Sequence, residues 1–128
     1  MKQKITIFSS EFPPGPGGIG CHAFHLADKL FQFGWDVQVI TEQIYVDKIE
    51  ASTFNKKQAF KIVVIPPLSS RITGINGYII SLISILKHRP SIVIGTGASV
   101  LKKTNFFSSL FKTKLVFVDH GTEFGMNE

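Results

Sequence analysis

A run of glycines and prolines between two hydrophobic segments constrains the fold of this chain more than any other feature. Residues 11–20 read EFPPGPGGIG and hold three prolines and four glycines. A helical pattern follows at once, with apolar side chains at three- and four-residue spacing: Ile19, Ala23, Leu26, Ala27, Leu30 and Phe33. Residues 4–8 and 36–41 have the composition of short strands, and Gly34 marks the helix end. The sequence therefore predicts a βαβ unit with a glycine-rich loop before its helix.

This glycine loop stands where a protein can bind an anion. The first turn of a helix has backbone N–H groups without partners and carries partial positive charge. Gly17 and Gly18 directly precede that turn and have no side chain to keep a phosphate away. The alternative is that the glycines only permit a sharp turn with positive φ. Four glycines exceed what a turn needs, so the pattern favours a loop that binds a diphosphate or another anion.

Strands and helices alternate along the rest of the chain. Residues 42–57 are polar and irregular and predict a surface loop. Further strands are expected at 58–65, 91–95 and 115–118, a buried helix at 78–87, and a last helix at 100–111. The alternation indicates an α/β fold, a doubly wound, Rossmann-like parallel sheet with helices on both faces.

Ligands of such sheets bind outside the carboxyl ends of the strands. Three loops are expected to leave that edge: residues 9–18, residues 96–98 around Gly97, and residues 119–125 around His120. We expect these loops to converge, so that the glycine loop and His120 face the same ligand.

Composition narrows the class of protein. The chain has 128 residues, of which 44% are hydrophobic and 18% charged, as expected for one globular domain. Cys21 is the single cysteine, so the chain forms no intramolecular disulfide. No signal-peptide pattern is visible, and the longest apolar stretch, residues 78–86, is too short to span a bilayer. We therefore expect a cytoplasmic protein.

The formal net charge of +5 has two readings. The lysines are ordinary solvated surface, or they attract an anionic membrane or substrate. The sequence has no zinc-finger spacing, RNA-binding motif or long basic run, so nucleic acid is not an expected partner.

A dinucleotide site is an alternative interpretation of the glycine loop. Gly15, Gly17 and Gly20 satisfy the G-x-G-x-x-G pattern, and Glu42 follows the second strand where a ribose-binding acid belongs. This pattern needs its first glycine close to the strand end. Here residues 9–14 intervene, and prolines stiffen the loop into an extended path. An NAD-binding oxidoreductase domain therefore stays the alternative.

The opening segment resembles the start of the retaining glycosyltransferases of family four, also called group 1, which have two Rossmann domains (GT-B). The similar pieces are Phe12–Pro14, Gly17–Gly20, His25–Ala27 with Leu30, Gly34–Val37 and Val39–Thr41. Two later pieces agree with this family: His88–Val93 resembles its H-x-P-D-x-V segment, and Val118–Gly121 resembles its strand-then-histidine loop. The chain departs from the family at Trp35, where a histidine is usual, and at Ser91, where an aspartate is usual.

The resemblance implies transfer of a sugar from a nucleotide-sugar donor to a sugar or lipid-linked acceptor, in polysaccharide or glycolipid synthesis. Gly17 and Gly18 map onto the loop that approaches the donor diphosphate, and His120 maps onto the loop histidine that contacts the transferred sugar. Neither a cofactor nor a metal is implied, because backbone N–H groups can stabilise the departing diphosphate. The expected acceptor-side residues are Glu11, His22, Gly97, Gly121 and Thr122.

The same resemblance implies a second domain. In this family the nucleotide site and a pair of glutamates belong to a C-terminal domain, and nothing in residues 1–128 matches it. We therefore expect residues 1–128 to be the acceptor-side, N-terminal domain of a longer enzyme, inactive alone. A non-catalytic α/β module that completes a site in a complex is the other alternative.

Two groups of side chains have both a structural and a functional reading. Cys21, His22 and His25 lie close in sequence, but a metal site would need a further ligand, so no metal is predicted. The predicted helix near the C-terminus mixes Lys102 and Lys103 with Phe106 and Phe107. Packing of the aromatic rings on the sheet is the default, and peripheral contact with the inner membrane face is the alternative.

Overall fold

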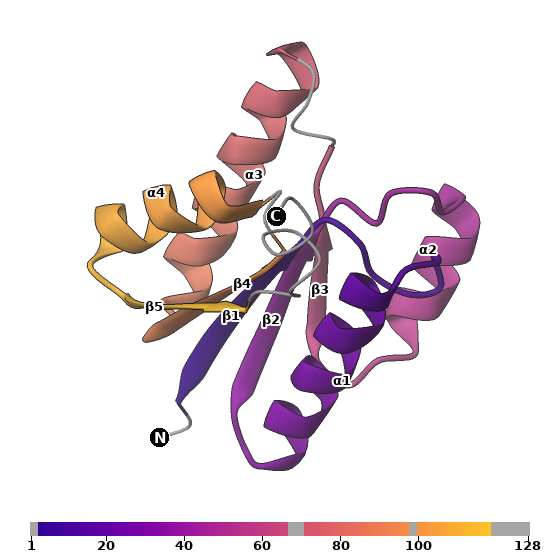
Figure 1. The fold of residues 1–128 in the computed structure, drawn as a ribbon, viewed down its shortest axis with the longest axis horizontal. Helices are drawn as coiled ribbons and strands as arrows, with labels where there is room; N and C mark the ends of the chain where they lie inside the picture. The colour runs from indigo at the N-terminus through magenta and orange to yellow at the C-terminus, as the bar shows by residue number, and fades with distance from the viewer. Residues whose placement is uncertain (1–2, 67–70, 98–99, 119–128) are drawn as a thin grey trace, which may run out of the picture.

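The computed structural model describes residues 3–66, 71–97 and 100–118, which form a five-stranded parallel sheet with helices on both faces (Figure 1). The strands are β1 (Lys4–Ser9), β2 (Asp36–Thr41), β3 (Lys61–Val64), β4 (Ile92–Thr96) and β5 (Lys114–Val118). The helices are α1 (Gly18–Gln32), α2 (Lys48–Lys56), α3 (Arg71–His88) and α4 (Leu101–Phe111). This architecture confirms the predicted doubly wound, Rossmann-like α/β fold.

The strand order is β3-β2-β1-β4-β5, and every neighbouring pair is parallel. From β1 the chain first builds outward through β2 to β3, and then crosses to the other side of β1 to add β4 and β5. The direction of growth thus changes between β1 and β4. In an open α/β sheet, the carboxyl ends of the two strands at such a change border the usual ligand crevice.

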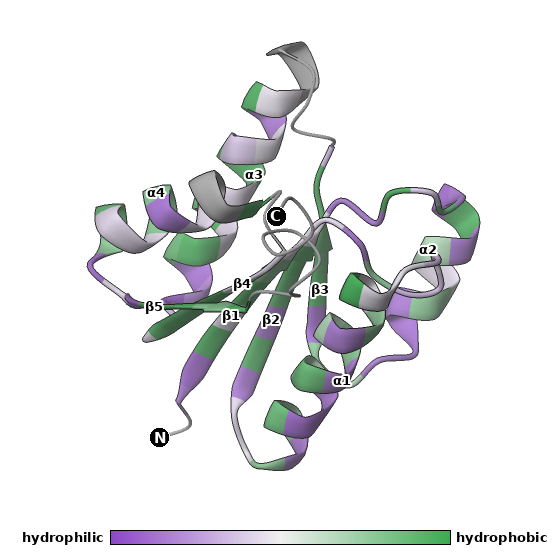
Figure 2. Cartoon of the chain, in the orientation of Figure 1, coloured by the Kyte–Doolittle hydropathy of each residue, from purple (hydrophilic) through white to green (hydrophobic). Residues whose placement is uncertain are grey.

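Two hydrophobic cores lie on opposite faces of the sheet. On one face, Ile7 of β1 and Val39 of β2 pack with Ala23 and Ala27 of α1. On the other, residues of β1, β2 and β4 pack with Ile85 of α3 and Phe107 of α4. The central strands are covered on both sides, and Figure 2 shows them mostly green between the two helix layers. Burial on both faces also includes polar side chains: the Thr6 hydroxyl of β1 donates a hydrogen bond to Oε1 of Gln38 on β2 (3.2 Å), and both residues are fully buried.

The prediction of a loop over residues 42–57 is wrong, because α2 lies within it. Asp47 is the N-cap, and its carboxylate accepts hydrogen bonds from the backbone N–H groups of Ile49 (3.1 Å) and Glu50 (3.4 Å). Only Ala51 of this helix is buried. A short, mostly exposed helix shows little hydrophobic periodicity, so the pattern does not reveal it.

Two further boundaries differ from prediction. Strand β3 covers four residues within the predicted 58–65, and α3 begins at Arg71 instead of residue 78. The helix is also not buried all round. Its outer face carries large side chains that are 47–63% exposed, which we call the apolar stripe: Ile75, Ile79, Ile83 and Leu86. The remaining strands and helices agree with prediction to within about two residues.

None of the helices in the described part of the chain is long and apolar enough to cross a membrane.

Candidate functional site

The glycine loop, residues 10–17, connects β1 to α1. It lies where the order of strand addition reverses, between β1 and β4. Ser9 at the end of β1 is paired with Thr96 at the end of β4. The Ser9 hydroxyl donates a hydrogen bond to the backbone carbonyl of Glu11 (2.6 Å), which turns the chain away from the sheet. The loop therefore leaves from the edge where the two central strands end.

Phe12 anchors the loop in the core beneath it. Its ring is fully buried and makes edge-to-face contacts with the rings of Phe24, Phe54 and Phe60, at centroid distances of 6.0, 6.4 and 6.5 Å. The following Pro13–Pro14 peptide is cis. The aromatic residue of the Phe12–Pro14 piece is thus a packing residue that fixes where the loop begins.

The segment after β2 holds the loop from the side. The Gln43 side-chain amide donates hydrogen bonds to the Pro13 carbonyl (3.0 Å) and to Oδ1 of Asn55 (2.8 Å). The Asn55 amide donates back to Gln43 Oε1 (3.0 Å). A side chain at Gly15 would meet Val46 of the same segment at 2.5 Å. The glycine loop and α2 are therefore mechanically linked through Gln43.

The N-terminus of α1 is open. Gly17 is the N-cap with φ 120°, no side chain caps the helix, and its first turn holds no acidic residue. A Cβ added at Gly18 would have no atom within 4 Å. Packing and a positive φ explain Gly17, but neither explains Gly18. An exposed glycine with empty space above it leaves the first backbone N–H groups of α1 accessible to an anion.

Glu11 lies beneath this opening. A side chain at Gly17 would collide with the Glu11 carboxylate, so the two residues are in contact. Oε1 of Glu11 is buried and has no hydrogen-bond partner in the described part of the chain. A buried carboxylate oxygen is stable when it accepts a hydrogen bond. The position therefore suits a ligand hydroxyl, and its negative charge disfavours a second anion at the same point.

The described residues supply no further metal ligand to the histidines and the cysteine of α1. Cys21, His22 and His25 are exposed, and His22 lies on the second turn of α1, next to the glycine loop. Within the described residues, no three His, Cys, Asp or Glu side chains are grouped so that they could hold a metal ion.

Gly97 lies at the carboxyl end of β4 and makes a structural turn. Its φ is 88°, and its N–H donates to the carbonyl of Val118 at the end of β5 (3.3 Å). This N–H is therefore occupied, and an acceptor role for Gly97 stays a prediction. His120, Gly121 and Thr122 lie outside the described residues.

The fold is similar to that of MurG from Acinetobacter baumannii, with a TM-score of 0.67 at 15% sequence identity. MurG is a GT-B glycosyltransferase. The chain has the fold of a GT-B domain. The match covers 90% of this chain and 34% of the MurG chain, so residues 1–128 span about a third of that protein. No protein-family model and no curated protein sequence matches the chain.

The His88–Val93 piece of the family resemblance has a structural explanation. Nε2 of His88 lies 3.2 Å from the carbonyl oxygen of Ile5 and 3.1 Å from that of Asp36, at the beginning of the sheet. The Ser91 hydroxyl donates to the Lys4 carbonyl (3.2 Å) at the same end. These residues secure α3 and β4 far from the carboxyl edge and are not part of the candidate site.

The predicted membrane contact needs one correction. Phe107 is 1% exposed, and its ring stacks on Phe8 in the core, so it cannot contact a membrane. Phe106 is 52% exposed and remains available. The Lys102 and Lys103 side chains lie outside the described part.

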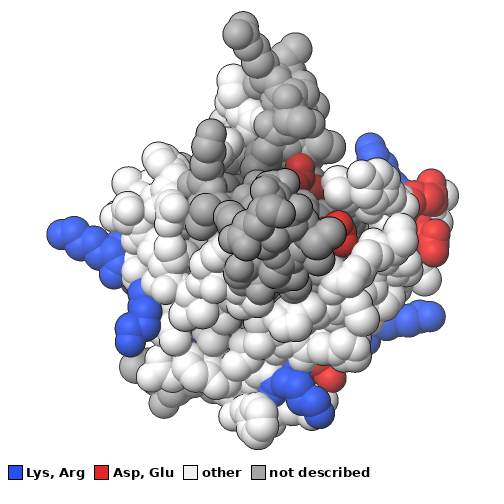
Figure 3. All heavy atoms as spheres, viewed as in Figure 1, with Lys and Arg blue, Asp and Glu red and all other residues white. Residues whose placement is uncertain are grey.

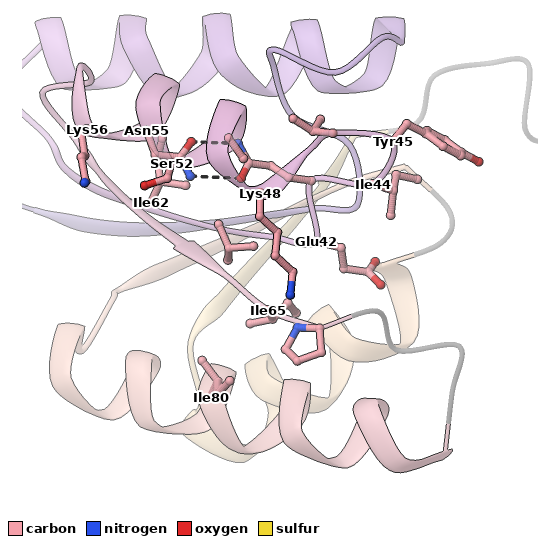
Figure 4. A pocket seen from close by; sticks show the side chains of 15 residues that line it. Glu42, Ile44, Tyr45, Lys48, Ser52, Asn55, Lys56, Ile62, Ile65 and Ile80 are labelled. Carbon is pink, nitrogen blue, oxygen red and sulfur yellow. Dashed lines mark hydrogen bonds between the residues drawn. The ribbon is translucent and has the colours of Figure 1, made fainter.

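Sequence reasoning missed Gln43 and Asn55, which join the loop to α2, and Lys48, which lines the cleft beside them. The polar composition of this region predicts an irregular loop, although Asp47 followed by Glu50 three residues later is a helix-start signal. Lys48 and Asn55 line a cleft between α2 and α3, together with Glu42 and Gln43 (Figure 4).

Proposed function

We propose that residues 1–128 are the acceptor-side domain of a glycosyltransferase that moves a sugar from a nucleotide-sugar to an acceptor, with retention of configuration. The GT-B fold supports a glycosyltransferase-like role. Membership of family four and retention rest on the sequence resemblance. A second domain, outside this chain, holds the nucleotide.

The open position at Gly18 carries the proposal. As the bond between sugar and diphosphate breaks, negative charge accumulates on the departing phosphate. Fixed N–H donors stabilise such charge without reorganisation, and they act more strongly where water is excluded. The first turn of α1 presents these donors, and it lies at the change of direction in the sheet where a ligand crevice is expected.

Glu11 has the complementary role in the proposal. Its unpartnered Oε1 accepts a hydrogen bond from an acceptor hydroxyl and orients that hydroxyl toward the sugar. His22 contacts the acceptor from α1, and Gly97, Gly121 and Thr122 border it. His120 hydrogen-bonds the transferred sugar. The Glu11 carboxylate lies against Gly17, so the proposal puts the diphosphate at Gly18, where the position is open.

The test is sugar transfer by the native gene product, together with its intact mass. We expect a mass well above 14.2 kDa, transfer that depends on a nucleotide-sugar, and retained anomeric configuration by NMR. Glu11→Gln in that product should lower kcat/KM, while thermal unfolding stays near that of the parent. Sugar transfer by the purified 128-residue chain would contradict the proposal that a second domain is needed to bind the nucleotide. Reduction of a nicotinamide cofactor instead would favour the dehydrogenase alternative.

We also propose that the face formed by α3 and α4 contacts an anionic membrane. The apolar stripe lies along one side of α3, since its members recur at four-, four- and three-residue spacing. Phe106 and Leu110 of α4 are likewise about half exposed, and the Phe106 ring meets that of Tyr78 on α3 at 6.1 Å. Exposed apolar side chains thus extend across two helices, as in an interaction surface.

The charge distribution favours anionic lipid as the partner. Residues 51–118 contain no aspartate or glutamate and ten basic residues: Lys56, Lys57, Lys61, Arg71, Lys87, Arg89, Lys102, Lys103, Lys112 and Lys114. Figure 3 shows only basic side chains around α4 and β5, whereas the acidic ones gather toward α1 and α2. Basic residues beside an apolar surface are attracted to negatively charged headgroups.

A further inference from the structure

A large cleft opens at the β3 edge of the sheet, where α2 and α3 lie on opposite faces and leave the edge strand uncovered between them (Figure 4). Its volume is about 1120 Å³. Small-molecule sites usually measure about 300–1,000 Å³, so the cleft is large enough for a ligand of lipid-like size. We call it the α2–α3 cleft.

The wall of the α2–α3 cleft is mainly aliphatic, and its side chains come from four parts of the chain. They are Ile44 and Val46 from the segment after β2, Ile62 and Val64 from β3, Ile65 beyond it, and Ile80 from α3. Val64 is 46% exposed, although it is an aliphatic residue on a strand. Burial of a hydrocarbon chain against such a wall stabilises the complex by about 25 cal/mol for each Å² of apolar surface removed from water.

Two lysines line the cleft, Lys48 and Lys56, and Lys48 is the one that reaches across the apolar wall. Figure 4 shows the Lys48 side chain extending across the cleft toward Ile65. Glu42 also lines the cleft, and its carboxylate is directed away from the Lys48 ammonium. In the described part of the chain, the Lys48 ammonium makes no hydrogen bond or ion pair. An ammonium beside aliphatic groups is stabilised by a negatively charged partner.

We propose that the α2–α3 cleft binds an anionic amphiphile, with the hydrocarbon chain along the aliphatic wall and the anionic group at Lys48. The cleft lies at the carboxyl ends of β2 and β3 and is linked to the glycine loop through Gln43 and Pro13. A peptide strand added to β3 is the competing occupant, but β3 offers only four residues for pairing. The proposal concerns binding alone and does not depend on sugar transfer.

The experiment titrates the 128-residue chain with decyl phosphate below its micelle concentration, followed by amide NMR shifts and calorimetry. Decanol tests the chain without the charge, and inorganic phosphate tests the charge without the chain. We expect saturable shifts at Val64, Ile65 and Lys48 with decyl phosphate, weaker binding of decanol, and no comparable shifts with phosphate. Equal shifts with inorganic phosphate, or none with decyl phosphate, would overturn the proposal.

Val64→Asp is the decisive variant because a matched control exists at the opposite edge of the sheet. Val64 on β3 is 46% exposed and Val116 on β5 is 42% exposed, and both belong to edge strands. Val64→Asp should weaken decyl phosphate binding about tenfold or more, since it puts an unpaired charge against the hydrocarbon chain. Val116→Asp should leave binding unchanged. Equal losses in the two variants would place the ligand elsewhere.

Lys48→Met tests the anionic end of the ligand, with Lys29→Met on α1 as its control. The loss of a charge-assisted hydrogen bond should weaken decyl phosphate about tenfold and leave decanol unaffected. Lys48→Arg should restore most of the affinity for the phosphate. If Lys48→Met weakens decanol and decyl phosphate to the same extent, the role of Lys48 as the anion partner is wrong.

Discussion

Gly18 and Gly17 are neighbours with different reasons to be glycine. Gly17 has a positive φ and lies against Glu11, so a side chain there would strain the backbone and collide. Gly18 has empty space around it. The sequence motif contains both glycines but does not show which one is structurally required. That difference depends on the Glu11 side chain, which lies against Gly17 and not against Gly18.

Gly18→Asp should therefore separate stability from anion binding. The new carboxylate lies at the N-terminus of α1, where it stabilises the helix by about 0.3–1 kcal/mol through the helix dipole. The same charge repels a diphosphate and fills the open position. We expect an unchanged or slightly higher Tm and about tenfold weaker binding of pyrophosphate, measured by calorimetry.

Two variants make that result specific. Phe33→Asp adds the same charge at the opposite end of α1, where Phe33 is 80% exposed, and should leave pyrophosphate binding unchanged.

Gly20→Ala tests packing, because its Cβ would lie 2.8 Å from the backbone N of Phe12. We expect Gly20→Ala to lose about 1–3 kcal/mol of stability, as for overpacked sites. Pyrophosphate binding that Gly18→Asp does not weaken would remove the anion site from the first turn of α1.

At the scale of elements, the long periodic segments are readable from sequence and the short ones are not. α1 shows its buried face through the spacing of Ala23 and Ala27, and Gly34 ends it with a positive φ. α2 buries one residue, so it depends on its cap more than on packing. The cap signal at Asp47 is local and visible in the sequence, but a polar composition hides it among loop residues.

Asp47→Ala should for this reason weaken α2 selectively. Removal of an N-cap costs about 0.5–2 kcal/mol, and the bonds lost here are those to Ile49 and Glu50. Hydrogen exchange should accelerate in α2, while β1 and β4 keep their protection. Asp28→Ala is the control, since Asp28 is a mid-helix residue of α1 whose carboxylate accepts a hydrogen bond from the Gln32 amide. Uniform acceleration throughout the sheet would contradict a local role for the cap.

At the scale of the whole molecule, the sequence predicts the sheet and its two helix layers but not the exposed side of α3. An apolar helix is normally buried all round, so the sequence predicts a buried helix at residues 78–87. In the fold, α3 packs on the central strands through Ile85 and has nothing described over its outer side. Exposure of the apolar stripe depends on how the helix and sheet layers are arranged. A local sequence pattern therefore cannot predict it.

The arrangement leads to a test of the proposed membrane contact. Ile79→Ser combined with Ile83→Ser removes two members of the apolar stripe that are 49% and 47% exposed. Exposed substitutions change stability by only about 0.5 kcal/mol each, so the fold should persist. Binding to vesicles that contain anionic lipid should fall about tenfold or more in a flotation assay.

Ile49→Ser is the matched control, because Ile49 is 77% exposed on α2, outside the stripe. It should float with anionic vesicles as the parent chain does. Added salt should weaken the parent's binding, since the basic residues around α4 and β5 act through a screened field. Flotation that is independent of anionic lipid, or an equal loss in the Ile49 variant, would show that exposed apolar area alone causes the binding. Charge would then not select the partner of the α3–α4 face.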